Sequence, residues 1–454
     1  MKTVAFHNLG CKVNSYEIEV MQQNFEKSGY IIVPFDTKAD IYVINTCTVT
    51  NIADRKSRQM LHRAKKANPD SVVVATGCYV QTNTEQALAD EAIDICIGNN
   101  RKNAIVTIVE EYIAKRRIES IEPVIDINHT DEYETMTLEK TAEHVRAYIK
   151  IQDGCNQFCT YCAIPYARGR VRSRHSEEIL AEVRNLCERG YKEFVLTGIH
   201  ISSYGMDFIG KNDGDYLTGK PDIRREAYER EYLLNLIKQI DEIPGVKRIR
   251  LGSLEPRIVT DRFVSELSQI KSVCPHFHLS LQSGCDETLR RMNRRYTSDE
   301  YYEGVELLRR YYDHPAITTD IITGFPGETD EEFAITEMFT EKVEFYETHL
   351  FKYSKRQGTV ADKLPNQNTE AVKAARSDVL MKINIANGIK YREYYIGREL
   401  EVLIEEEKVI GGKKYMVGHT PNYIMCAVAG ETKVNEIVSG RAIRMLDDET
   451  IYIE

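Results

Sequence analysis

Short apolar runs alternate with amphipathic stretches along the first 120 residues. The apolar runs predict strands at Val4–His7, Ile41–Asn45, Val72–Thr76 and Ile93–Ile97, and the stretches between them predict helices at Asn14–Lys27, Asn51–Ala67 and Thr84–Asp90. Strands that alternate with helices are typical of a parallel sheet covered by helices. We therefore predict an N-terminal parallel α/β sheet domain over residues 1–120.

A polar and acidic stretch at residues 121–145 predicts a linker. Beyond it the alternation resumes, with strands expected at Ala147–Ile151, Glu193–Thr197, Arg248–Leu251, Phe277–Leu281, Ile317–Ile322 and Phe345–Phe351. An amphipathic helix over Ser176–Arg189 separates the first two of these strands. Six such units predict a partial parallel (βα)6 barrel over residues 146–370, with its function at the carboxyl ends of the strands.

The pattern changes again after residue 370. A helical stretch predicts a connector over residues 371–396, and strand-like runs then follow at Glu399–Ile404, Lys414–Val417, Tyr423–Val428, Val434–Val438 and Ala442–Leu446. Five short strands in so few residues predict a small β-barrel over residues 397–454. The predicted fold class is α/β, with an all-β unit at the C-terminal end.

The composition is typical of a globular chain with several domains. Its 454 residues exceed the size of a single core, and 42% of them are hydrophobic. No run approaches the roughly 20 apolar residues of a membrane span, and the N-terminus lacks the long apolar region of a signal peptide. Eleven cysteines, several in metal-like settings, fit a reducing environment better than a disulfide framework. We expect a cytoplasmic protein with no membrane partner.

Three cysteines on one short loop, Cys155, Cys159 and Cys162, are the strongest chemical signal in the chain. Thiolates at this C-x3-C-x2-C spacing suit an iron–sulfur cluster or part of a zinc site. A structural zinc site is closed by four ligands, and the next cysteine, Cys187, falls inside a predicted helix. The spacing therefore favours a cluster with one iron left open. Loop cysteines without a ligand, or a zinc site completed by a distant residue, are the alternatives.

A second group of three cysteines is spread over the N-terminal domain. Cys11, Cys47 and Cys78 each follow a predicted strand. In a parallel sheet such positions fall on the same edge, where ligands bind. The residues alone leave two interpretations open, a second iron–sulfur site or unrelated buried cysteines.

The cysteine loop, with the aromatic Tyr161 just before its last cysteine, resembles the signature of radical S-adenosylmethionine (SAM) enzymes. In that family SAM chelates the open iron, and an electron from the cluster cleaves SAM to a 5′-deoxyadenosyl radical. Cys11, Cys47 and Cys78 match one by one the N-terminal domain of the methylthiotransferases, in which three cysteines hold a second 4Fe–4S cluster. The C-terminal unit is similar in position to the TRAM domain of RNA-modifying enzymes. The resemblance implies a methylthiotransferase that uses two 4Fe–4S clusters and SAM.

Polar groups at the strand ends are the expected SAM contacts. In the fourth strand of the barrel His278, Ser280 and Gln282 share one face, which indicates either a bound polar ligand or a wet barrel rim. By resemblance, Thr197 and Gly198 take the place where radical SAM enzymes contact the methionine amino group, and the stretch around Gly324 is similar to the motif near the adenine. The expected cofactor-binding residues are Tyr161, Thr197, Gly198, Glu255, Gln282, Asp320 and Gly324.

Clusters of basic residues indicate a polyanionic partner in spite of a net charge of −10. One lies in the predicted helix Asn51–Ala67, one follows the cysteine loop, and one spans residues 290–295. We predict RNA contacts at Arg168, Arg170, Arg172, Arg174, Lys413 and Lys414. The last two belong to a unit that is acidic overall, so a purely structural role for that unit is the alternative. An insertion at residues 202–230 is a lid, an RNA contact or a surface excursion.

Residues 10–14 and 165–174 resemble the MtaB branch of the methylthiotransferases. That branch installs a methylthio group on C2 of N6-threonylcarbamoyladenosine at position 37 of tRNA, beside the anticodon. The arginines of the second stretch suit its threonyl carboxylate, since Arg pairs bidentately with carboxylates. Partners implied are tRNA, an electron donor such as flavodoxin or ferredoxin, and a sulfur source. Alternatives are action on N6-isopentenyladenosine of tRNA or on an aspartate of a small-subunit ribosomal protein, a non-enzymatic Fe–S RNA-binding protein, and a radical SAM oxidoreductase.

Overall fold

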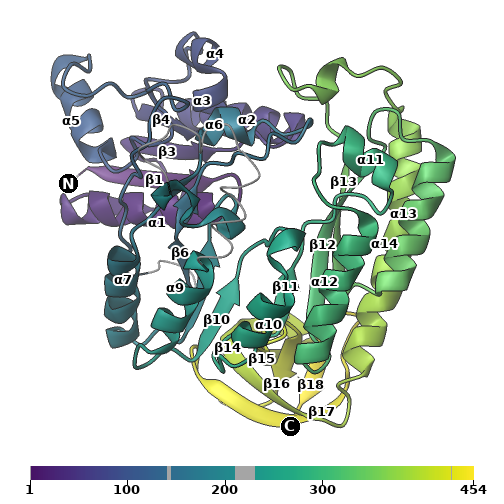
Figure 1. Ribbon diagram of the computed structural model, residues 1–454. Helices are drawn as coiled ribbons and strands as arrows, with labels where there is room; N and C mark the ends of the chain where they lie inside the picture. The colour runs from purple at the N-terminus through teal and green to yellow at the C-terminus, as the bar shows by residue number, and fades with distance from the viewer. Residues whose placement is uncertain (1, 141–144, 210–230, 431) are drawn as a thin grey trace.

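The computed structural model of the chain describes residues 2–140, 145–209, 231–430 and 432–454. Most of the insertion predicted at residues 202–230 therefore lies outside the described residues. Figure 1 shows the N-terminal sheet with helices on both of its faces, the helices and strands of the central unit beside it, and a strand-rich C-terminal unit below them. None of the described helices is long and apolar enough to cross a membrane.

The N-terminal unit is a five-stranded parallel sheet with the strand order β2-β1-β3-β4-β5. Its strands are β1 (Thr3–Asn8), β2 (Ile31–Val33), β3 (Ile41–Thr46), β4 (Val72–Gly77) and β5 (Ile95–Ile97), and its helices are α1 (Lys12–Lys27), α2 (Asn51–Ala67), α3 (Cys78–Thr82), α4 (Thr84–Leu88) and α5 (Ile105–Lys115). The predicted parallel α/β sheet is confirmed. The sequence pattern missed β2 because three residues at a sheet edge are too few to show a periodicity.

The central unit has six parallel strands that follow one another in chain order. They are β6 (Arg146–Lys150), β9 (Glu193–Thr197), β10 (Arg248–Leu251), β11 (His276–His278), β12 (Ala316–Thr323) and β13 (Glu347–Lys352). Two sheets, β10-β9-β6 and β11-β12-β13, are joined by the bridges Ile249–Val273 and Leu254–Leu279. The described helices around them are α6 (Ile164–Arg168), α7 (Ser176–Glu188), α9 (Tyr232–Asp241), α10 (Asp261–Leu267), α11 (Asp286–Arg291), α12 (Ser298–Tyr311) and α13 (Asp330–Val343). The predicted partial barrel is confirmed.

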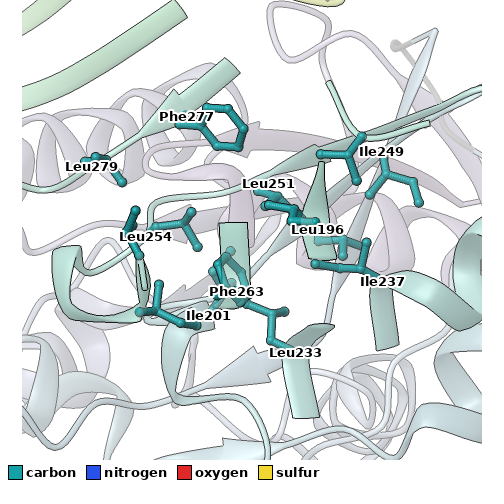
Figure 2. Packing of buried hydrophobic residues seen from close by; sticks show 14 of the residues in the cluster. Leu196, Ile201, Leu233, Ile237, Ile249, Leu251, Leu254, Phe263, Phe277 and Leu279 are labelled. Carbon is teal, nitrogen blue, oxygen red and sulfur yellow. The ribbon is translucent and has the colours of Figure 1, made fainter. Parts of the chain in front are cut away.

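Aliphatic side chains hold these strands in place (Figure 2). Leu196 of β9 and Ile249 and Leu251 of β10 pack with Ile237 of α9 in one buried cluster. Each such side chain stabilises the fold by about 1.5–3 kcal/mol on burial. This packing fixes where the strands end, and the carboxyl ends carry the polar residues of the site.

The C-terminal unit follows a long helix, α14 (Glu370–Glu393), and is a closed barrel. Its strands are β14 (Glu399–Ile410), β15 (Lys413–His419), β16 (Met425–Val428), β17 (Ile437–Met445) and β18 (Thr450–Ile453), in the order β14-β15-β16-β18-β17. The small barrel is confirmed, but two predicted strands, Val434–Val438 and Ala442–Leu446, form the single strand β17. Gly440 separates the two predicted strands in the sequence, but in the structure it lies inside β17. A Cβ at this position would lie only 2.7 Å from the Glu454 carbonyl oxygen. The final strand β18 was not predicted.

The stretch at residues 121–140 connects two units but is packed against both of them. Met136 and Leu138 are buried, and the Tyr16 hydroxyl of α1 donates to the Met136 carbonyl. The Gln23 side chain donates to the Thr137 carbonyl at 3.1 Å. The polar composition predicted only a linker, whereas in the structure this segment is hydrogen-bonded both to α1 and to Glu182 of the barrel helix α7.

Candidate active site at two groups of cysteines

Cys11, Cys47 and Cys78 lie at the carboxyl ends of neighbouring parallel strands. Cys11 follows β1 and precedes α1, Cys47 follows β3, and Cys78 begins α3 directly after β4. Burial, followed by the negative charges that Cys78 and Cys11 would carry, raises the pKa of Cys47 to about 12. Three residues that are about thirty positions apart in sequence therefore lie within electrostatic range of one another.

The turn between β4 and α3, next to Cys78, has room for glycine only. Gly77 has a φ of +101°, and a Cβ there would lie 2.6 Å from Oδ1 of Asn45. Glycine is therefore required where β4 turns into α3 and presents Cys78. Two amides approach the sulfurs, because Asn14 Oδ1 lies 3.6 Å from the Sγ of Cys11 and Asn99 Nδ2 lies 3.6 Å from the Sγ of Cys78.

The second group lies on the loop that leads into α6. The backbone N–H of Cys162 donates to the carbonyl of Cys159 at 3.0 Å, which closes a tight turn. Burial, then the charges of Cys159 and Cys155, raises the pKa of Cys162. Nη1 of Arg294, which follows α11, donates to the Sγ of Cys159 at 3.3 Å.

Both groups suit a cationic sulfur-bound centre. A thiol with a raised pKa stays protonated unless a metal replaces its proton, and neighbouring thiolates are stable only around positive charge. Cys187 does not extend the second group, since it packs on α7 against Gly245. The residues present therefore fit two clusters, each held by three thiolates.

A cavity of about 140 Å³ adjoins the second group of cysteines. Three of the expected SAM contacts, Tyr161, Glu255 and Gln282, line this cavity together with Cys155, Cys159 and Cys162. Further lining residues come from the strand ends after β9, β10 and β11 and include His200, Ser253 and Ser280. The cavity thus lies where a ligand bound to the open iron would extend over the carboxyl ends of the strands.

Four expected SAM contacts lie outside the lining of this cavity. Thr197 is buried at the end of β9, and Gly198 lies beside Gln152, just before the lining residues Ile199 and His200. Gly324 has a φ of +69°, and a Cβ there would collide with the side chain of Lys373. Its close approach is therefore to helix α14. Asp320 points from β12 toward His278.

Three of the four arginines predicted to contact RNA are instead internal. Arg168 is buried between Glu17 and Asp153, and Arg174 is buried against Glu182. Arg172 is also buried, and its guanidinium donates to the Arg170 carbonyl at 3.3 Å. The prediction that these three contact RNA is wrong, because all three are enclosed: Arg168 joins Glu17 of α1 to Asp153, and Arg174 pairs with Glu182 of α7.

The other predicted RNA contacts keep access to solvent. Arg170 is half-buried with its guanidinium 4.5 Å from the ring centroid of Phe158. Lys413 and Lys414 are exposed on β15, and Lys414 pairs with Glu407 at 2.7 Å. These three residues stay predictions.

A polar cleft of about 400 Å³ lies between the N-terminal and central units. It is lined by residues of α2 and α3 on one side and by Arg356–Thr359 on the other, and it includes the side chain of Arg58. Helix α2 carries the exposed basic residues Arg55, Lys56, Arg58, Arg63 and Lys66. The basic cluster predicted in this helix is therefore a surface feature beside the cleft.

Sequence reasoning missed the roles of Arg294 and Lys12. Arg294 was counted among four arginines of a basic cluster, so nothing in the sequence distinguished it as a neighbour of Cys159. Lys12 adjoins Cys11 in the first turn of α1 and lies within electrostatic range of Arg250 of β10 and Arg146 of β6.

Two family profiles match the chain. The Radical SAM superfamily matches residues 149–339, and Uncharacterized protein family UPF0004 matches residues 3–98. The chain is 38% identical to the threonylcarbamoyladenosine tRNA methylthiotransferase MtaB of Bacillus subtilis, over 99% of this chain and 98% of the relative. It is 36% identical to the protein of the same name from Aquifex aeolicus, over 96% of this chain and 98% of the relative. A tRNA-2-methylthio-N(6)-dimethylallyladenosine synthase of Finegoldia magna is 32% identical over 91% of this chain and 86% of the relative.

Solved structures resemble the fold. The radical SAM methyltransferase TsrM of Kitasatospora setae, with cobalamin and a [4Fe-4S] cluster bound, superposes with a TM-score of 0.51 at 14% identity. That match covers 77% of this chain and 72% of TsrM. The cobalamin-dependent SAM radical enzyme OxsB gives a TM-score of 0.51 at 10% identity, over 83% of this chain and 56% of OxsB.

Proposed function

Because the chain belongs to the radical SAM methylthiotransferases of the MtaB type, we propose that it installs a methylthio group on C2 of N6-threonylcarbamoyladenosine at position 37 of tRNA. The observation that carries this proposal is the presence of two separate groups of three cysteines, one of them beside a cavity at the carboxyl ends of the barrel strands. A single group would serve SAM cleavage alone. The enzyme is a transferase that uses two 4Fe–4S clusters and SAM.

Cys155, Cys159 and Cys162 would hold the cluster that binds SAM, and Cys11, Cys47 and Cys78 would hold the second cluster. When bound, the two clusters and SAM supply the one-electron chemistry and the sulfur donor that the protein side chains lack. Arg294 donates a hydrogen bond to Cys159, which stabilises negative charge on that sulfur. Tyr161, Glu255 and Gln282 are placed to bind and orient SAM in the cavity beside these cysteines.

We assign the tRNA surface to helix α2 and the polar cleft beside it. Exposed arginines and lysines bind phosphates without reading the sequence, and the cleft runs between the two units that carry the cysteines. We propose a separate role for each of the domains at residues 1–120, 146–370 and 397–454. The first two would hold the clusters, and the C-terminal barrel would dock on tRNA through Lys413 and Lys414, as a TRAM domain does.

Two further partners follow from the chemistry. Cleavage of SAM consumes an electron, so a reduced flavodoxin or ferredoxin would serve as donor, and a sulfur source must renew the methylthio group. Because its proposed substrate is tRNA, we propose that the protein acts in the cytoplasm.

Mass spectrometry of tRNA nucleosides tests the proposal. Cells that lack the protein should accumulate N6-threonylcarbamoyladenosine without its 2-methylthio derivative, and their methylthiolated isopentenyladenosine should be unchanged. A plasmid with the wild-type chain should restore the missing nucleoside. Loss of the isopentenyl derivative instead would assign the protein to the other tRNA branch, and unchanged nucleosides would overturn a role in tRNA.

A further inference from the structure

Three potential metal ligands come together on adjacent strands of the barrel. His278 ends β11, Asp320 lies in the middle of β12, and His349 lies in β13. Within the part of the chain that the structure describes, this is the one cluster in which at least three His, Cys, Asp or Glu ligand atoms all lie within 4.8 Å of one another.

The strand register explains why these three residues meet. His278 is paired with Thr318, and Asp320 lies two residues beyond Thr318 on the same face of β12. Asp320 is paired directly with His349 on the next strand. Three adjacent parallel strands thus present two imidazoles and one carboxylate to the same side of the sheet.

The spacing of the ligand atoms fits a shared ion. Nε2 of His278 lies 3.3 Å from Oδ2 of Asp320. Two ligands that bind one ion at about 2.1 Å, with bond angles between octahedral and tetrahedral, lie about 3.0–3.4 Å apart. The rings of His278 and His349 have centroids 5.6 Å apart, and a ligand nitrogen of His349 lies within 4.8 Å of the ligand atoms of the other two residues.

A hydrogen bond orients the imidazole of His278 as metal ligands are usually oriented, and the imidazole of His349 has a carboxylate nearby. Nδ1 of His278 lies 3.0 Å from the hydroxyl oxygen of Thr318, which leaves Nε2 for the ion. Oε1 of Glu347 lies 3.6 Å from Nδ1 of His349, on the side away from a ligating Nε2. A metal-bound histidine commonly has its second ring nitrogen hydrogen-bonded to such an oxygen.

We propose that His278, Asp320 and His349 form a binding site for a divalent first-row transition-metal ion. Imidazole nitrogens select such ions over Mg²⁺ and Ca²⁺, which prefer oxygen ligands. Two histidines and one carboxylate leave coordination positions open. Ser280 and Gln282, which follow His278 closely in the chain, line the cavity beside the cysteines.

Manganese binding to the reconstituted full-length enzyme tests this proposal. The clusters are kept in the oxidised 4Fe–4S state, which gives no electron paramagnetic resonance (EPR) signal, so the decrease of the free Mn²⁺ signal reports binding alone. Wild-type enzyme should bind one Mn²⁺ per chain, Zn²⁺ should displace it, and nitrogen couplings from imidazole should appear in the bound signal. His349→Ala and Asp320→Asn should each weaken this binding by more than about tenfold while the iron content stays the same.

A surface pair provides the matched control. Nδ1 of His129 lies 2.6 Å from Oδ2 of Asp126, and this exposed pair belongs to no three-ligand group among the described residues. His129→Ala should bind Mn²⁺ as the wild type does. Equal Mn²⁺ affinity in the wild type, His349→Ala and Asp320→Asn, or no binding in any of them, would overturn the proposal and leave Asp320 as an ion-pair partner of His278.

Discussion

The guanidinium of Arg168 and the carboxylate of Glu17 form an ion pair in the interior, with Nη1 and Oε1 2.5 Å apart. Glu17 belongs to α1, which begins next to Cys11, and Arg168 ends α6, which follows the loop of Cys155, Cys159 and Cys162. Arg168 Nη2 also donates to Oδ1 of Asn14 at 2.8 Å. This pair therefore fixes the position of one group of cysteines relative to the other.

Replacement of Glu17 by Gln should destabilise the protein strongly. Glu17 also pairs with Lys102 and Lys150, so its loss removes the carboxylate partner of Lys102 and leaves the buried cations Lys150 and Arg168 to share Asp153. Breaking a buried ion pair in this way costs about 3–5 kcal/mol, measured as the free energy of unfolding in urea. Glu139→Gln, which removes the partner of Lys27 in an exposed pair, should cost less than about 1 kcal/mol. Equal effects of the two substitutions would show that the buried network is not a fastening between the units.

The arginines that follow the cysteine loop show which part of the structure could not be predicted from the sequence. Alternating charged residues predicted a surface for RNA, but the carboxylates that accept Arg168 and Arg174 are Glu17 and Glu182. Glu17 is 151 residues away from Arg168, and a single sequence does not show which distant charges pair. Each parallel strand, in contrast, carries its own signal in its apolar run, so the sheets were predictable.

The same distinction applies to the site. The cysteine groups were predictable because each cysteine follows a strand or shares a loop, so the topology alone places them. The triad of His278, Asp320 and His349 depends on register between strands, where a shift of one residue turns an inward side chain outward. Arg294 follows a helix that is distant in sequence from Cys159, so its contact depends on the tertiary fold. Sequence reasoning recognised the polar face of His278 but not its partners.

Arg58→Ala should weaken tRNA binding and reduce its salt dependence. Arg58 lines the cleft beside α2, and one lost phosphate contact lowers the slope of log K against log salt by about one. Fluorescence anisotropy with labelled tRNA at several salt concentrations measures that slope. Arg310→Ala, an exposed arginine of α12 near Asp261, is the control and should leave the slope as it is. If both variants bind like the wild type, the RNA surface lies elsewhere.

Cys187 should react with iodoacetamide only at high pH. Burial, followed by the charge of Glu188, raises the pKa of its thiol to about 11. At pH 8 the thiolate fraction is then about 100-fold lower than for an unperturbed thiol of pKa about 9, and it rises about tenfold per pH unit. Peptide mass spectrometry of the holoenzyme, with glutathione as the reference thiol, measures the rate. Labelling at pH 8 as fast as that of glutathione would contradict this prediction.

Replacement of Cys11, Cys47 and Cys78 together by Ala should separate SAM cleavage from sulfur transfer. The variant should retain about four irons per chain instead of about eight and should still produce 5′-deoxyadenosine. It should form no methylthiolated nucleoside, because the sulfur donor site is gone. Iron and sulfide analysis and liquid chromatography measure these three quantities. Cys187→Ala is the matched control with all activities retained, and loss of SAM cleavage in the triple variant would show that the two sites are not independent.

Arg294→Met should lower the reduction potential of the cluster at Cys155, Cys159 and Cys162. Arg294 donates to the Cys159 sulfur at 3.3 Å, and its positive charge stabilises the reduced, more negative cluster. Without it, reduction is less favourable, so SAM cleavage with a fixed electron donor should slow although iron content is unchanged. An EPR-monitored redox titration measures the potential, best in the variant without Cys11, Cys47 and Cys78, where one cluster gives the signal. Arg295→Met removes an exposed neighbouring charge and should leave the potential close to that of the parent. A potential that falls equally in both variants would indicate a general charge effect and exclude a specific hydrogen bond to sulfur.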